Sequence, residues 1–228
     1  MNLYPFEATV AGGADFNTCI ENIDIGGPAL VRSAAKNFKD VVVITSNYQI
    51  EDLIYELTIN KGSTSLKFRK QLSQEAFNET AYYDSNISKF FNKITDNKYP
   101  NKITFSGKLI SKLRYGENPH QSAAIYSFKD KLNLKQLNGK KLSYNNYNDI
   151  FAALLISRSL PKNIGTVIIK HANPCGVSIN KNKLESYKLA LACDPVSAFG
   201  GIVSCNFKIR KNLALELKKI YLEVVICN

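Results

Sequence analysis

The 228-residue sequence is poor in the residues that build metal sites and disulfide frameworks. It contains only two histidines, His120 and His171, and five cysteines, an odd number with no Cys-x-x-Cys pair. These counts predict neither a disulfide scaffold nor a histidine or thiolate metal site, and we expect no metal. No run approaches the roughly 18 to 20 apolar residues that a membrane span needs. The N-terminus also lacks a basic-then-apolar signal, so we expect a cytoplasmic location and no membrane partner.

The net charge alone does not choose among the possible classes of binding partner. Thirty basic residues against 19 acidic ones give a net charge of +11, which suits nucleic acid, a membrane surface or small polyanionic substrates. The lysines are scattered and no nucleic-acid-binding signature accompanies them, so we expect no nucleic acid partner. A non-catalytic basic fragment that binds nucleotides or RNA stays open as the alternative function. An affinity for random RNA that falls steeply with rising salt concentration would favour that alternative.

The sequence patterns predict an α/β protein in two parts. In the first part, Gly26-Gly27-Pro28 opens a helix over residues 29–37, and the apolar residues 41–45 are typical of a buried strand. Near-helical apolar spacing over residues 51–97 predicts surface helices, broken at residues 61–63. Residues 96–102 are typical of a linker, and we place the domain boundary near Ser111.

The second part alternates short strands with helices. Its expected elements, in chain order, are a loop at 114–121, a strand at 123–126, a helix from about 148 to 159, a strand at 166–170, a helix at 184–193 and a strand at 201–205. A hydrophobic fraction of 45% is enough to give one or two such domains a core.

The sharpest local feature is the segment 167–176, in which a buried-type strand delivers Lys170 and His171 to its carboxyl end. Residues 173–176, Asn-Pro-Cys-Gly, are predicted to turn, with Gly176 at a positive φ. A lysine beside a neutral imidazole suits formyl transfer to a weak amine, because the imidazole accepts a proton while the cation stabilises developing negative charge. An ordinary surface turn is the competing interpretation. A zinc deaminase site is excluded because positions 173 and 178 are Asn and Ser.

A second segment, residues 113–121, concentrates polar side chains in a loop constrained by glycine and proline. Arg114 is suited to bidentate binding of a phosphate, and Tyr115 and His120 to a ribose or a carboxamide. A polar turn that satisfies only its own backbone explains the same residues.

Three further residues have simple structural interpretations. Asp24 precedes a helix start and either caps that helix or helps to hold an anion. Lys36 is by default a solvated helix lysine. Phe199, among small residues, is either a stacking surface for a flat heterocycle or part of the core.

Four groups of strings, in this order, resemble the bifunctional AICAR transformylase/IMP cyclohydrolase family. They are residues 2–6 with 23–27 and 34–37; residues 113–121; residues 142–146; and residues 170–176 with 194–195 and 197–201. The resemblance implies formyl transfer from 10-formyltetrahydrofolate to AICAR, followed by closure of the product FAICAR to inosine monophosphate.

The resemblance also implies roles for particular residues. For transformylation, His171 would be the general base and Lys170 its partner for the developing charge. For ring closure, Tyr4, Asp24 and Lys36 fall on the family's active-site positions. The remaining implied substrate-binding residues are Arg114, Tyr115, His120, Asn173 and Phe199, of which Phe199 would lie near the folate.

The fold that the resemblance implies has two domains. Residues 1–111 would be the C-terminal part of a methylglyoxal-synthase-like cyclohydrolase domain plus a linker. Residues 112–228 would be the first part of a cytidine-deaminase-like transformylase domain without zinc. The family is homodimeric and its chain is more than twice this long. We therefore expect an internal fragment with little turnover by itself. A cyclohydrolase alone is less favoured, because the family's phosphate loop precedes the matched segment.

Overall fold

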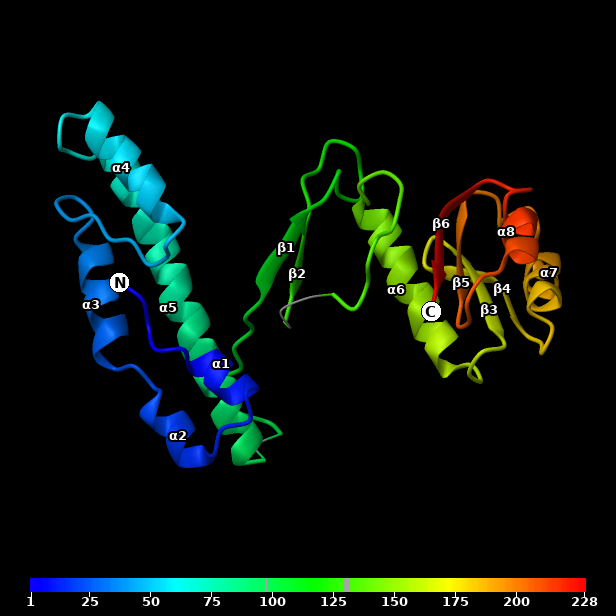
Figure 1. Cartoon of the computed structure of the whole chain (residues 1–228), viewed down its shortest axis with the longest axis horizontal. Coiled ribbons are helices and arrows are strands. Elements are labelled where there is room, and N and C mark those ends of the chain that lie inside the picture. Colours follow the sequence, from blue (N-terminus) through cyan, green and yellow to red (C-terminus); the bar gives the residue numbers. More distant parts are fainter. Residues whose placement is uncertain (97, 129–131) are drawn as a thin grey trace. The chain divides into compact units, whose positions relative to one another are not determined.

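A computed structural model describes residues 1–96, 98–128 and 132–228, which form two compact units, residues 1–108 and 109–228 (Figure 1). Helices and mixed sheets confirm the α/β class. The domain boundary predicted near Ser111 falls inside strand β1 (Lys108–Lys112). Of the predicted linker, Asn97 lies outside the described residues, and its other residues form neither helix nor strand.

The first unit is helical. Its helices are α1 (Phe6–Ala11), α2 (Phe16–Glu21), α3 (Gly26–Lys36), α4 (Gln49–Ile59) and α5 (Leu66–Ile94). The predicted break between the last two is confirmed, because Lys61 and Gly62 adopt φ values of 53° and 89°. Helix α3 packs beside α5 (Figure 1) through a small buried cluster of Val31, Ala35 and Ala76.

The strand predicted at residues 41–45 is wrong. These residues are half-buried and belong to no ladder. Their backbone bonds are local or terminal: the N–H of Val41 donates to Asn37 at 2.9 Å, and the N-terminal amine of Met1 donates to the Ile44 carbonyl at 2.6 Å. A strand exists only beside another strand. Among the described residues before Lys108 none forms one, so the high β-propensity of this segment has no partner to act on.

The second unit is built around a four-stranded sheet. Its elements are β1 (Lys108–Lys112), β2 (Ala124–Ser127), α6 (Tyr144–Ser159), β3 (Gly165–Lys170), β4 (Asn173–Ile179), α7 (Lys183–Cys193), β5 (Gly201–Cys205), α8 (Lys211–Leu217) and β6 (Leu222–Cys227). The sheet order is β4-β3-β5-β6, with β6 parallel to β5 and the other pairs antiparallel. Strands β1 and β2 form a separate two-stranded sheet.

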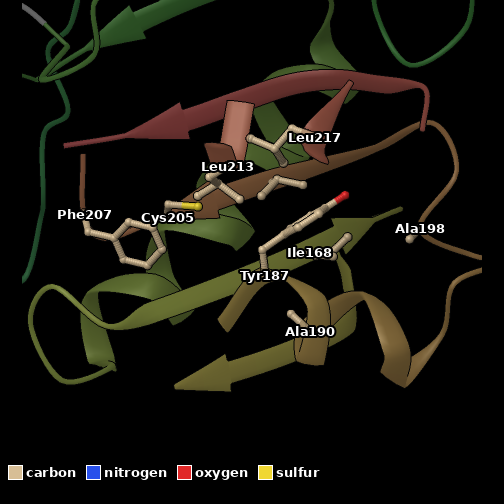
Figure 2. Close-up of a cluster of buried hydrophobic side chains, with 9 residues drawn as sticks. Ile168, Tyr187, Ala190, Ala198, Cys205, Phe207, Leu213 and Leu217 are labelled. Atoms are coloured by element: carbon tan, nitrogen blue, oxygen red, sulfur yellow. The ribbon is translucent and has the colours of Figure 1, made fainter. Parts of the chain in front are cut away.

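Helices cover both faces of the four-stranded sheet. Helix α6 packs on one face through Ile150 and Ala153, against Val167 and Ile169 of β3. On the other face, α7 and α8 enclose a cluster that includes Tyr187, Ile168 and Leu213 (Figure 2). Each fully buried large apolar side chain contributes roughly 1.5–3 kcal/mol. The two central strands, β3 and β5, are therefore the rigid base from which the surrounding loops extend.

The turn predicted at residues 173–176 is also wrong. Asn173 already begins β4, and the chain reverses two residues earlier, at His171 and Ala172. Gly176 does not take the predicted positive φ. It lies in β4 against α7, where an added Cβ would be 1.8 Å from the Ala190 carbonyl oxygen. This glycine is required for close approach of backbones rather than for a turn.

Helix α6 begins four residues before the predicted start near Asn148. Ser143 and Asn146 form a capping box, in which each side chain bonds the other residue's backbone N–H. Asparagine is a rarer partner in this motif than Glu or Gln, so the sequence indicates this helix start only weakly.

Candidate functional site

Lys170 and His171 lie at a tight hairpin turn between β3 and β4. Lys170 pairs with Asn173 across the hairpin, which leaves His171 and Ala172 as its two turn residues. Their φ values are 53° and 59°, so both are left-handed, as in a type I′ turn. Glycine and asparagine normally occupy such positions, and a left-handed conformation costs other residues roughly 1–2 kcal/mol each. The turn therefore needs support from elsewhere.

Asp149 of α6 supplies part of that support. Its carboxylate accepts hydrogen bonds from the backbone N–H of Ala172 at 2.7 Å and of His171 at 3.3 Å. Asn173 adds a bond from its side-chain nitrogen to the His171 carbonyl at 2.8 Å. These bonds hold the backbone and leave the exposed His171 imidazole without a hydrogen-bond partner among the described residues.

The Lys170 side chain joins this turn to the segment before β5. Its Nζ donates to the Phe199 carbonyl at 2.6 Å. The Phe199 ring is 59% exposed and lies 5.7 Å from the Tyr221 ring. Phe199 is therefore not a core residue, and its role as a stacking surface stays a prediction.

Asp194 braces the start of the same segment. Hydrogen bonds from Ser197, including one from its backbone N–H at 2.9 Å, lower the pKa of the Asp194 carboxyl. The segment is thus held at Asp194 and again at Phe199, where Lys170 binds.

The arginine loop, residues 113–123, connects β1 to β2. It is closed by backbone bonds from Leu113 to Ala123 at 2.9 Å and from Gly116 to Gln121 at 2.8 Å. Arg114 donates to the Tyr115 hydroxyl at 3.0 Å, and its guanidinium lies 4.7 Å from the centre of the Tyr115 ring.

Arg114 and His120 both line an open hollow of about 600 Å³ beside this loop. Neither Lys170 nor His171 is among the residues that line it. The hollow presents a cation and an imidazole to solvent, which suits an anionic ligand.

The first turns of α6 connect the arginine loop with the Lys170–His171 turn. Tyr144 donates its backbone N–H to the Tyr115 carbonyl at 3.2 Å, and the Asn145 side chain donates to the Glu117 carbonyl at 3.0 Å. Asn145 and Asp149 are four residues apart, so they project from the same helix face. One face of one helix therefore binds both loops.

Asp149 and Asn145 are the functional candidates that the sequence patterns missed. The available signal was the spacing of two polar side chains, four residues apart, on a helix that otherwise faces an apolar sheet. The string 142–146, which carries part of the family resemblance, contains Asn145 but ends before Asp149.

In the first unit, Tyr4 and Asp24 are adjacent. One carboxylate oxygen of Asp24 accepts the N–H of Tyr4 at 3.3 Å and the other accepts that of Gly27 at 2.6 Å. The second bond caps the start of α3, as expected for Asp24. The backbone N–H of Asp24 in turn donates to the Tyr83 hydroxyl at 2.8 Å. Tyr4, Tyr83 and nearby residues line a hollow of about 280 Å³.

Lys36 is not brought to Tyr4 and Asp24. It lies in the last turn of α3, whereas Asp24 precedes the first. At a rise of about 1.5 Å per residue, the two ends of this helix are about 15 Å apart. Lys36 is exposed there, as its interpretation as a solvated helix lysine predicts.

In residues 1–96, 98–128 and 132–228, no group of three or more His, Cys, Asp and Glu side chains is placed to hold a metal ion. None of the helices described there has the length and apolar character to cross a membrane.

Nearly the whole chain is similar to known proteins. Residues 34–228 match the family model described as the AICARFT/IMPCHase bienzyme. The chain is 49% identical to the bifunctional purine biosynthesis protein PurH of Bradyrhizobium diazoefficiens and to that of Rhodospirillum rubrum, and 46% identical to that of Caulobacter vibrioides. Each alignment covers 99% of this chain and 44% of the relative. The chain thus spans less than half the length of these relatives.

Proposed function

The chain belongs to the AICARFT/IMPCHase bienzyme family, and we propose that it contributes to both activities in that name: formyl transfer from 10-formyltetrahydrofolate to AICAR, and closure of FAICAR to inosine monophosphate. Purine biosynthesis is the process named for its relatives. The observation that carries the proposal is the strained turn that presents Lys170 and His171, bound to the same helix face as the arginine loop.

In formyl transfer, the AICAR amine forms a C–N bond to the formyl carbon while the bond from that carbon to the folate nitrogen breaks. An aromatic amine is a weak nucleophile, so it must lose a proton as it attacks. The free His171 imidazole is our proposed acceptor of that proton, which then passes to the departing nitrogen.

Lys170 is the proposed stabiliser of the negative charge that develops on the formyl oxygen. Its ammonium has three donors. One is bound to the Phe199 carbonyl, which orients the group and leaves two for a substrate.

Substrate binding is assigned to the loops on either side. Arg114 is the proposed phosphate ligand, with Tyr115 and His120 beside it. Asn173 binds the His171 carbonyl through its amide nitrogen, and its oxygen stays available to a substrate. The exposed Phe199 ring offers a flat surface for the folate heterocycle.

For ring closure we propose the first unit, where Tyr4 lines the hollow and Asp24 binds the backbone N–H of Tyr4. Asp24 would act mainly by fixing the backbone of Tyr4, since its carboxylate accepts two backbone N–H groups. For Lys36, the proposed part in ring closure rests on the family resemblance alone. We further propose that residues 1–111 belong to a methylglyoxal-synthase-like domain and residues 112–228 to a cytidine-deaminase-like one. The active assembly is proposed to be a homodimer.

A hybrid protein tests this assignment in a chain of full length. Residues 1–228 replace the matching stretch of the Bradyrhizobium diazoefficiens relative, and formyl transfer and ring closure are assayed separately. Lys170→Ala and His171→Ala are expected to abolish formyl transfer and spare ring closure. Asn148→Ala, an exposed neighbour on α6, is the matched control and should change neither rate. Equal loss of both activities in the two variants would overturn the division of roles.

A further inference from the structure

The left-handed residues at positions 171 and 172 are the feature that calls for explanation. A type I′ turn is ordinarily built from Asn-Gly or Gly-Gly, whereas here it is built from His-Ala. Non-glycine residues stay in this conformation only where surrounding structure holds them, and such positions cluster at functional sites. The turn sits directly beside Lys170, so whatever holds it also determines where the lysine and the imidazole lie.

The Asp149 carboxylate is placed to hold it. Within the hairpin, the N–H groups of His171 and Ala172 point away from the strand ladder and need another acceptor. Both oxygens of Asp149 are used, one for each N–H, at 3.3 Å and 2.7 Å. Hydrogen bonds to an ionised carboxylate are stronger than neutral ones. The half-buried position of Asp149 on α6 limits competition from water.

The same helix also carries Asn145, which holds the arginine loop through the Glu117 carbonyl. Because α6 is anchored to the sheet by Ile150 and Ala153 on its buried face, its two polar contacts are fixed relative to β3. The spacing between the two loops thus depends on one rigid element.

We propose that Asp149 is a positioning residue for the site: its carboxylate locks the His171–Ala172 turn in the left-handed conformation and thereby sets the imidazole in register with the arginine loop. The catalytic part of this inference rests on the proposed function. The structural part, that Asp149 holds the turn, does not.

The structural part is tested on the 228-residue chain by NMR. In Asp149→Ala, the backbone amide resonances of His171 and Ala172 should move upfield and exchange faster with solvent, since both bonds to the carboxylate are lost. Asp149→Asn retains one acceptor oxygen and should give intermediate shifts, which guards against a general loss of folding in the alanine variant. Asn148→Ala should leave both resonances in place. Unchanged amides in Asp149→Ala would overturn the inference.

The catalytic part is tested in the hybrid. Asp149→Ala should lower kcat for formyl transfer about 100-fold, the scale expected for a displaced catalytic group, with little change in KM for AICAR. Adding Ala172→Gly should recover much of that loss, because glycine adopts the left-handed conformation without help. A loss of kcat that Ala172→Gly does not recover would contradict the positioning role.

Two outcomes separate this inference from the proposed function. If the amides move but kcat is unaffected, Asp149 holds the turn without positioning it for catalysis, and the inference fails alone. If the hybrid with native residues transfers no formyl group, the proposed function fails and the catalytic role of Asp149 fails with it, while the NMR result still decides whether the carboxylate holds the turn.

Discussion

Replacing Gly176 by alanine should destabilise the second unit strongly. Gly176 lies in β4 opposite Ile168, and an added Cβ would be 1.8 Å from the Ala190 oxygen, 2.8 Å from the Ala190 carbonyl carbon and 3.1 Å from Cys193 Cβ. Ordinary contacts of a Cβ begin near 3.4 Å. The closest atoms belong to the backbone of α7, so no side-chain rotation relieves the overlap.

The size of the effect follows from what has to move. Ala190 is 1% exposed and Ile168 is fully buried, so α7 can retreat from β4 only by opening the core. Overpacking of a core typically costs about 1–3 kcal/mol, and a clash between main chains belongs at the upper end. We therefore expect Gly176→Ala to lower the free energy of unfolding of this unit by about 3 kcal/mol, a large share of the usual 5–15 kcal/mol or so.

Urea unfolding followed by the two histidine ring signals measures this directly, because His120 and His171 both belong to the second unit. The control is Gly26→Ala, at the start of α3, where an added Cβ meets nothing within 4 Å. Circular dichroism should show that variant to be neutral or slightly stabilised. A midpoint for Gly176→Ala equal to that of the unaltered chain would refute the close-approach explanation.

Two further substitutions test individual polar groups. The Tyr187 hydroxyl is buried and has no hydrogen-bond partner among the described residues. Tyr187→Phe should therefore leave stability unchanged or raise it by about 1 kcal/mol in urea unfolding, and a clear loss would mean that the hydroxyl has a partner. Because hydrogen bonds from Ser197 lower the pKa of Asp194, its ionised form stabilises the fold above the ordinary aspartate pKa, and this contribution is lost as pH falls through the lowered value. Asp194→Asn should accordingly be less stable than the native chain at neutral pH, and the difference should shrink in acid. A difference that is independent of pH would contradict this.

Much of the second unit could be predicted from its sequence, because its elements have strong local signals. Strand β5 is a short, mostly apolar run that begins at the second of two glycines, and the observed strand has the predicted bounds, Gly201–Cys205. The buried strand before Lys170 is likewise recognisable, since four consecutive apolar or β-branched residues, 166–169, are typical of a strand covered on both faces.

The failures come from interactions between distant segments. Residues 41–45 have the composition of a strand, yet strand formation depends on a neighbour that local sequence does not specify. The reversal at His171 was misplaced by two residues because Pro174 and Gly176 are stronger turn signals than His-Ala. A His-Ala turn is possible here because Asp149 binds its backbone. Asp149 is more than twenty residues earlier in the chain and comes next to the turn only through the packing of α6.

The candidate site divides in the same way. Lys170, His171 and Arg114 are predicted from residue type and local pattern, whereas the contacts that relate them run through α6 and the Phe199 carbonyl. Tyr4 and Asp24 are joined by a hydrogen bond from the Tyr4 backbone N–H to the Asp24 carboxylate, which the spacing of twenty residues does not reveal.

The most direct test of the central claim is a titration of the 228-residue chain with AICAR, followed by the ring C–H signals of its two histidines. His120 reports on the arginine loop and His171 on the turn. If both loops border one nucleotide site, AICAR should move both signals with the same saturation curve, and Arg114→Ala should weaken that curve for both. Movement of one signal without the other, or of neither, would contradict the account.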